Sequence, residues 1–200
     1  MASTSGNKQK HESNNPIQRA LIHRFKQQAI ELVHRVAPRT ILEVGCGEGY
    51  MLQALAEGGV PADLVGVDFS KPAVLDARQR LGDRAQVEQR DARELAEDGR
   101  TFDLVMMLEV LEHIPQPAQM LPILEQLTHR HLLLSVPWEP MFRGLNMMRG
   151  KNVRAWGNDP EHVNHWGRRG FFRFVEQRFR ILEAPLCAPW TMVLAETRGA

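Results

Sequence analysis

A glycine-rich segment carries the first chemical signal in this sequence. Gly45, Gly47 and Gly49 lie between an apolar run and an amphipathic one. Glycine lets the backbone turn tightly and approach a ligand without a Cβ clash, and a helix that follows offers free N–H groups to an anion. The spacing is G-x-G-x-G rather than the G-x-G-x-x-G of dinucleotide-binding loops. The segment therefore predicts a nucleotide-type ligand, and a nicotinamide-dependent oxidoreductase is the disfavoured alternative.

Two acidic residues follow the next two predicted strands. Asp68 ends the second strand, where a carboxylate can accept hydrogen bonds from both hydroxyls of a ribose. Asp91 follows the third strand, where its carboxylate can accept an adenine amino hydrogen while the N–H of Ala92 donates to the ring. Each acid alone is more often a turn former or a helix cap. Together with the glycine loop they lie at consecutive strand ends, where open α/β sheets bind ligands.

A third cluster, Glu109-Val-Leu-Glu112-His113, comes directly after the fourth predicted strand. Two carboxylates and one imidazole can bind a divalent cation, and this donor set suits Mg²⁺ or Mn²⁺ better than structural zinc. Such a cation would bind an acceptor hydroxyl and lower its pKa. The alternative is that the acids only start a helix, where negative charge is favoured. In that case His113 is the expected general base, since an imidazole with a pKa of about 6.5 accepts a proton at neutral pH.

The segment 137–167 breaks the regular pattern and predicts a long functional loop or lid that contains a short helix. One face of the predicted helix is apolar and consists of Met141, Phe142, Leu145 and Met148. The basic residues near it are Arg143, Arg149, Lys151, Arg154, Arg168 and Arg169. Two interpretations stay open: a lid whose charges meet water, or an acceptor site for an amphipathic or anionic molecule. His165 is expected to orient the substrate or to be structural.

Alternating strands and helices are expected to position these groups. Short apolar runs alternate with amphipathic stretches, which favours a parallel sheet covered on both faces. The expected strands are 40–44, 63–68, 85–90, 102–108, 130–136, 179–183 and 191–197. The expected helices are 16–37, 48–57, 72–81, 118–127 and 168–177, with a short turn through Leu95. The last two strands have a link too short for a helical crossover, so they should be antiparallel neighbours.

The composition is that of one ordinary globular domain. The chain has 200 residues, 25 Lys and Arg against 24 Asp and Glu, and two cysteines. We expect residues 1–15 to be a disordered polar tail and residues 16–200 to form a single domain of a cytoplasmic protein. The balanced charge gives no general attraction to nucleic acid or membranes, so such binding would need a local patch. No oligomeric state is predicted.

Four motifs together resemble those of the class I S-adenosylmethionine-dependent methyltransferases. They are Glu43-Val-Gly-Cys-Gly-Glu-Gly, Gly66-Val-Asp-Phe-Ser, Gln89-Arg-Asp-Ala and Phe102-Asp-Leu-Val-Met-Met-Leu-Glu-Val-Leu-Glu-His. The resemblance covers residues 40–136. It implies a Rossmann-like α/β fold with a seven-stranded sheet in the order 3-2-1-4-5-7-6, strand 7 antiparallel and helices on both faces.

The resemblance also implies S-adenosylmethionine as the cofactor. The glycine loop would hold its methionine part, Asp68 the ribose, and Asp91 with Ala92 the adenine. The remaining residues expected to contact the cofactor are Glu43 and Cys46 at the loop, Phe69 after the ribose acid, and Leu108.

The expected acceptor is a hydroxyl oxygen of a small molecule. In-line transfer needs the oxygen about 3 Å from the methyl group in a shielded pocket, and the hydroxyl must also lose its proton. The ubiquinone-pathway O-methyltransferases carry a similar Glu-x-x-Glu-His and use it to bind a metal. The small-RNA 2′-O-methyltransferases do so too, and add a His four residues before a Trp, a spacing that His162 and Trp166 match.

On that resemblance the candidate metal ligands are Glu109, Glu112, His113 and His162, and the candidate catalytic residues are His113, His162 and His165. A metal-assisted RNA 2′-O-methyltransferase, with Trp138, Trp156 and Trp166 to stack bases, is the alternative. The near-neutral charge and the absence of a recognisable RNA-binding appendage count against it. A binding module that has lost catalysis is disfavoured by the intact glycine loop and both acids.

Overall fold

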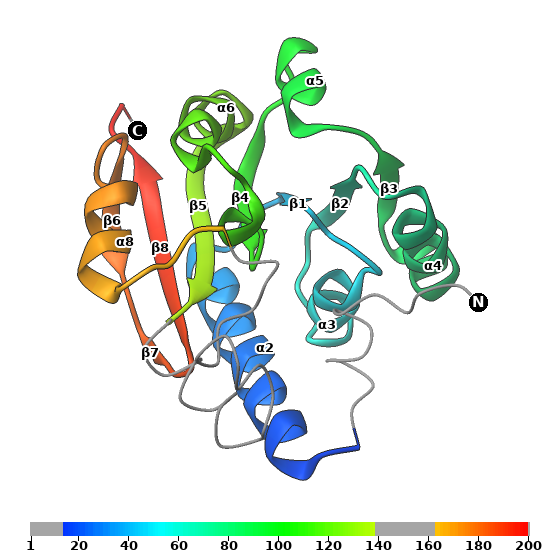
Figure 1. The fold of residues 1–200 in the computed structure, drawn as a ribbon. Helices are drawn as coiled ribbons and strands as arrows, with labels where there is room; N and C mark the ends of the chain where they lie inside the picture. Colours follow the sequence, from blue (N-terminus) through cyan, green and yellow to red (C-terminus); the bar gives the residue numbers. More distant parts are fainter. Residues whose placement is uncertain (1–13, 139–162, 200) are drawn as a thin grey trace.

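A mixed sheet forms the centre of the fold (Figure 1). The computed structural model describes residues 14–138 and 163–199. The strands are β1 (Thr40–Val44), β2 (Asp63–Asp68), β3 (Gln86–Gln89), β4 (Phe102–Leu108), β5 (Thr128–Pro137), β6 (Phe179–Glu183), β7 (Leu186–Cys187) and β8 (Trp190–Thr197). They are ordered β3-β2-β1-β4-β5-β8-β6, and β7 pairs with β8 beside that order. The predicted order is confirmed, with β8 as the predicted seventh strand.

The direction of the strands also agrees with the prediction. β1 to β5 are parallel to one another, whereas β8 runs antiparallel to both β5 and β6. The two-residue strand β7 was not predicted. It lies in the link between β6 and β8, and its Leu186 and Cys187 pair with Thr191 and Trp190.

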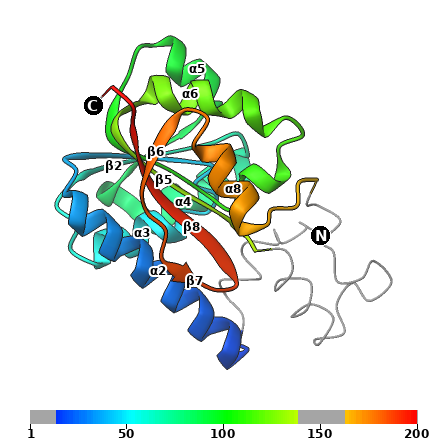
Figure 2. The same ribbon diagram turned by 90° about the vertical axis from the view of Figure 1, so that its left-hand side faces the viewer.

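Helices cover both faces of the sheet, as Figure 2 shows. They are α2 (Pro16–Val36), α3 (Tyr50–Glu57), α4 (Lys71–Leu81), α5 (Ala92–Glu97), α6 (Met120–Leu127) and α8 (Arg168–Val175), with 3₁₀ turns η1 (Gly82–Arg84), η2 (Leu111–His113) and η3 (Pro117–Gln119). Side chains of α2, α3 and α4 share one hydrophobic core, and those of α5, α6 and α8 share the other. The segment that ends at Leu95 was predicted as a turn, but it is helical.

Both faces are apolar because successive strand residues point to opposite sides. Ile41 lies in the core beneath α2, α3 and α4, whereas its neighbour Leu42 lies in the other core. Both side chains are fully buried. This two-sided burial explains the near-continuous apolar runs in the sequence.

Helix α2 is fastened to the domain along its length. It begins at Pro16 because the Asn15 side chain accepts the N–H groups of residues 17 and 18. It ends at Val36, because the C-cap residue Ala37 adopts the left-handed conformation directly before Pro38. Near its middle, Phe25 contacts the Trp190 ring at a centroid distance of 4.9 Å. Within residues 14–138 and 163–199, no helix has the length and hydropathy that a bilayer crossing requires.

Candidate functional site

The carboxyl ends of the parallel strands β1 to β5 lie along one edge of the sheet. The strand order reverses at β1, since β2 and β3 lie on one side of it and β4 and β5 on the other. Ligands of open α/β sheets bind in the crevice at such a reversal. The glycine loop follows β1, so it lies at the centre of this edge.

The glycine loop has a backbone conformation that other residues rarely adopt. Gly45, Gly47 and Gly49 have φ values of 73°, 52° and 77°. The N–H of Gly45 donates to the carbonyl of Val67 at 2.8 Å, which ties the loop to β2. A Cβ at position 45 would lie 2.6 Å from Cγ2 of Val110, in the segment after β4. Position 45 therefore requires glycine for both its conformation and the space available to it.

Asp68 links the glycine loop to the turn after β2. Its carboxylate accepts the N–H of Gly47 at 2.9 Å and the N–H of Ser70 at 2.8 Å. The residue is buried. Each carboxylate oxygen retains a further lone pair, which the ribose contact predicted for this residue would use.

Phe69 follows β2, and Asp91 comes shortly after the edge strand β3. The Asp91 carboxylate accepts the N–H of Arg93 at 2.8 Å and so caps α5. The N–H of Arg90 donates to the carbonyl of Asp68 at 3.0 Å, which holds the ends of β2 and β3 together. Phe69 is 82% exposed and offers its ring for stacking. Two further predicted contact residues, Ala92 of α5 and Leu108 of β4, are buried.

Glu43 is a carboxylate enclosed beneath the loop. Its Oε2 atom is buried and has no hydrogen-bond partner among the described residues. Burial, and secondly the charge of Asp68, raise the pKa of Glu43 to about 8, although a hydrogen bond from the Leu52 backbone opposes the rise. The carboxyl is therefore mostly protonated at neutral pH. Burial also raises the pKa of the neighbouring Cys46 thiol, so this cysteine is no nucleophile.

Lys26 of α2 was missed by the sequence reasoning. Its Nζ lies 5.5 Å from the centre of the Tyr50 ring, and the Arg80 guanidinium lies 3.9 Å from the same ring. Burial lowers the pKa of Lys26, whereas the charges of Glu57 and Glu43 raise it. A half-buried positive charge beside the first residue of α3 suits the carboxylate of a bound amino acid. A lysine on an amphipathic helix gives no signal of this kind, because its usual place is the solvent-facing side.

Three of the four predicted metal ligands, Glu109, Glu112 and His113, form no metal site within the described residues. Glu109 has a positive φ of 58°, and its carboxylate accepts the hydroxyl of the buried Ser135 at 3.0 Å. Glu112 is buried, whereas His113 is exposed. Within the described ranges, no three or more His, Cys, Asp or Glu side chains are arranged to hold a metal ion. His162, like the predicted helical face of the lid and its basic residues from 139 to 162, lies outside those ranges.

The two histidine-bearing segments are joined by a residue that we did not predict. The backbone N–H groups of Val163 and Asn164 both donate to the carbonyl of Glu112, at 2.9 and 3.1 Å. The Asn164 side chain donates to the carbonyls of Leu111 and Ile114 at 3.2 and 2.6 Å. His113 and His165 are therefore presented from segments that are fastened together, and both are exposed.

Replacing Gly45 by alanine should destabilise the protein by about 2 to 4 kcal/mol, from the left-handed backbone and from overpacking against Val110. Urea unfolding measures this cost. Adding Val110→Ala should recover the overpacking part but not the backbone part, so the double-mutant cycle should give a coupling of about 1 kcal/mol. If the effects of the two substitutions on the free energy of unfolding were additive, the contact between positions 45 and 110 would be contradicted.

Replacing Glu43 by glutamine should flatten the dependence of stability on pH. The folded protein holds the Glu43 proton more tightly than the unfolded chain, so the wild type loses stability as the pH rises from about 4.5 to about 8. Glu43→Gln lacks this titration. Its free energy of unfolding, relative to wild type, should therefore increase across that window by an amount on the order of a few kcal/mol. If the free energies of unfolding of the two proteins changed in parallel from pH 5 to 8, the pKa of Glu43 would not be raised in the folded protein.

Comparison with solved structures shows the same fold in known methyltransferases. Magnesium protoporphyrin IX methyltransferase from Synechocystis, solved with bound SAH, is 19% identical, with a TM-score of 0.68 over 92% of this chain and 88% of that chain. An N-methyltransferase from Bradyrhizobium japonicum, also with S-adenosyl-L-homocysteine, is 17% identical, with a TM-score of 0.67 over 93% and 90%. A plantazolicin methyltransferase bound to a substrate analogue and SAH reaches a TM-score of 0.71 at 16% identity over 96% and 91%.

Comparison of sequences also finds methyltransferases. A ubiquinone biosynthesis O-methyltransferase from Coxiella burnetii is 31% identical over 105 residues, or 50% of this chain and 44% of the relative. The corresponding enzyme from Azorhizobium caulinodans is 42% identical over 77 residues, or 37% and 30%. The chain thus spans less than half the length of the curated relatives it matches. The profile of the methyltransferase domain family matches residues 18–178, and the chain therefore belongs to that family, among the class I S-adenosylmethionine-dependent methyltransferases.

Proposed function

We propose that this protein transfers the methyl group of S-adenosylmethionine to a hydroxyl oxygen of a small amphipathic or anionic molecule. The observation that carries the choice of oxygen is the identity shared with two curated O-methyltransferases, 31% and 42% over the aligned stretches. Those alignments cover less than half of each relative, so the substrate of the relatives is not part of the proposal.

The cofactor would lie over β1, β2 and β3. The glycine loop would enclose its methionine part, with Lys26 near the carboxylate of that part. Asp68 would accept the ribose hydroxyls, because its two oxygens are already oriented by backbone N–H groups. Asp91 and Ala92 would contact the adenine edge, and the exposed ring of Phe69 would cover its face. When bound, the cofactor supplies a methyl group already activated by the sulfonium charge.

The acceptor would approach from the side of β4 and β5. Glu109 and Ser135 lie at the ends of these strands and are hydrogen-bonded to one another. His113 comes four residues after Glu109, at the end of η2, and its side chain is exposed. It would remove the proton of the acceptor hydroxyl. His165 would orient the acceptor from the segment that Asn164 fastens to η2.

A metal ion is not part of this proposal, because Glu109, Glu112 and His113 are not part of any group of three or more metal ligands among the described residues. Arg168 of the predicted basic patch is already engaged, since it donates to the carbonyl of Ala184 at 2.6 Å. Within the described part of the chain, no specific observation favours RNA over a small acceptor.

Asp68→Asn should weaken the binding of S-adenosylhomocysteine at least about tenfold, because charge-assisted hydrogen bonds to the ribose contribute about 1.5 to 3 kcal/mol each. Isothermal titration calorimetry measures the change. The matched control is Asp63→Asn, since Asp63 is exposed at the other end of β2. Equal affinities of wild type and Asp68→Asn would remove Asp68 from the ribose contact.

His113→Gln should lower the turnover number about a hundredfold and leave the affinity for S-adenosylhomocysteine unchanged, since a general base contributes about 10² to 10⁴ in rate. The assay follows labelled methyl transfer from S-adenosylmethionine to a panel of small phenols and alcohols, with and without an anionic group. His129→Gln, exposed at the opposite end of β5, is the control. Full activity of His113→Gln would overturn the base assignment. Activity lost in a chelator and restored by Mg²⁺ or Mn²⁺ would favour the metal site instead.

A further inference from the structure

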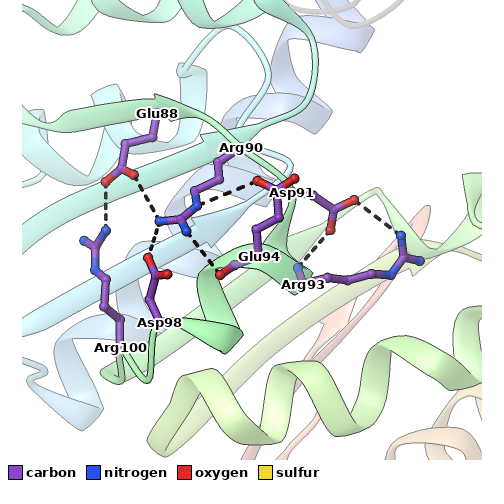
Figure 3. A network of polar contacts seen from close by, with 7 residues as sticks. All are labelled: Glu88, Arg90, Asp91, Arg93, Glu94, Asp98 and Arg100. Carbon is purple, nitrogen blue, oxygen red and sulfur yellow. Dashed lines mark hydrogen bonds and ion pairs between the residues drawn. The ribbon is translucent and has the colours of Figure 1, made fainter.

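Arg90 lies at the centre of the polar network drawn in Figure 3. Its guanidinium lies 2.5 Å from Asp98, 3.9 Å from Glu94 and 4.0 Å from Glu88. It also donates to the backbone carbonyl of Glu94 at 3.2 Å. Glu88 belongs to β3, Glu94 to the first turn of α5, and Asp98 is the C-cap residue of the same helix. One side chain therefore joins the end of β3 to both ends of α5.

Helix α5 depends on such contacts because it has only 6 residues. A helix this short is not stable on its own in water. Ala92 and Leu95 anchor its inner side in the hydrophobic core. On its outer side the anchor is Arg90, whose side chain is only 24% exposed. The hydrogen bond from Arg90 also holds the pKa of Asp98 below its usual range.

The same arginine connects the two acids of the cofactor edge. Its backbone N–H donates to the carbonyl of Asp68, the residue proposed to hold the ribose. Asp91, proposed to contact adenine, is the next residue and caps α5. A shift of α5 would therefore move the Asp91 carboxylate and the Ala92 N–H together, while Asp68 would stay fixed by Gly47 and Ser70.

We propose that Arg90 is a positioning residue that holds Asp91 and Ala92 against the adenine edge and so sets the preference for an amino group at the purine 6-position. This inference rests on the adenine contact in the proposed function. An amino group donates to the Asp91 carboxylate, whereas the oxo group of a hypoxanthine base is an acceptor and is rejected by it. Rejection of that kind is strong only where the carboxylate cannot turn away to water. Arg93 contacts the carboxylate directly, through its N–H at 2.8 Å and its guanidinium at 3.3 Å. Arg90 acts on it through the backbone, by holding both ends of the helix that Asp91 caps.

The test compares S-adenosylhomocysteine with S-inosylhomocysteine by isothermal titration calorimetry. Wild type should prefer the adenine compound at least about tenfold, as expected for a lost hydrogen bond and an unpaired carboxylate. Arg90→Gln should reduce that ratio at least about threefold, and so should Asp98→Asn, which neutralises the acid closest to Arg90. The matched control is Arg100→Gln, because Arg100 contacts Glu88 at 2.9 Å, from outside α5.

The ratio of the two affinities distinguishes a positioning role of Arg90 from an effect on overall stability. A general loss of stability lowers both affinities alike and leaves the ratio unchanged, and that result would overturn the role of Arg90. Equal binding of the two compounds by wild type would instead show that Asp91 does not contact adenine, which is a failure of the proposed function. Should Arg90→Gln not fold, Asp98→Asn decides: an unchanged ratio counts against the proposal and a reduced one supports it.

Discussion

The buried carboxylate of Asp68 is the contact on which the rest of the site depends. A buried charge is tolerated only where hydrogen bonds replace those of water. Here the N–H groups of Gly47 and Ser70 replace them, one from the glycine loop and one from the turn after β2. The loop can come this close because Gly45 takes a left-handed conformation against Val110. One carboxylate thus holds the glycine loop and the turn after β2 together.

Charged and neutral side chains divide this edge of the sheet into parts with different chemistry. Beneath the loop, Glu43 is held mostly neutral at pH 7 by its burial, and Lys26 places a positive charge on the side of α2. Along β2 and β3 the acids Asp68 and Asp91 are oriented by backbone N–H groups. Across β1, on the side of β4, the Glu109 carboxylate is bound to Ser135. The side proposed for the cofactor therefore carries the oriented acids, and the side proposed for the acceptor carries the imidazoles.

Peripheral segments keep these groups in place. Arg90 holds the ends of α5, and Asn164 holds the chain before α8 against η2. Neither contact is deeply buried, so each contributes little to global stability. Their effect is local: they restrain short segments that have few other anchors, and those segments carry Asp91, His113 and His165.

The sequence by itself determined the alternation of strands and helices, the glycine loop and the acids after it, because local patterns and short motifs encode them. The strand order came from the family resemblance. The sequence pattern did not predict α5, since the two buried residues of that helix, Ala92 and Leu95, are too few to distinguish a helix from a turn. Only the tertiary structure decided that Glu109 meets Ser135, that Lys26 approaches Tyr50 and that Asn164 joins two segments. It also showed that the Glu-x-x-Glu-His spacing does not gather its side chains into a metal site among the described residues. These contacts link residues far apart in the chain, and their geometry follows from how the elements pack, which no local pattern records.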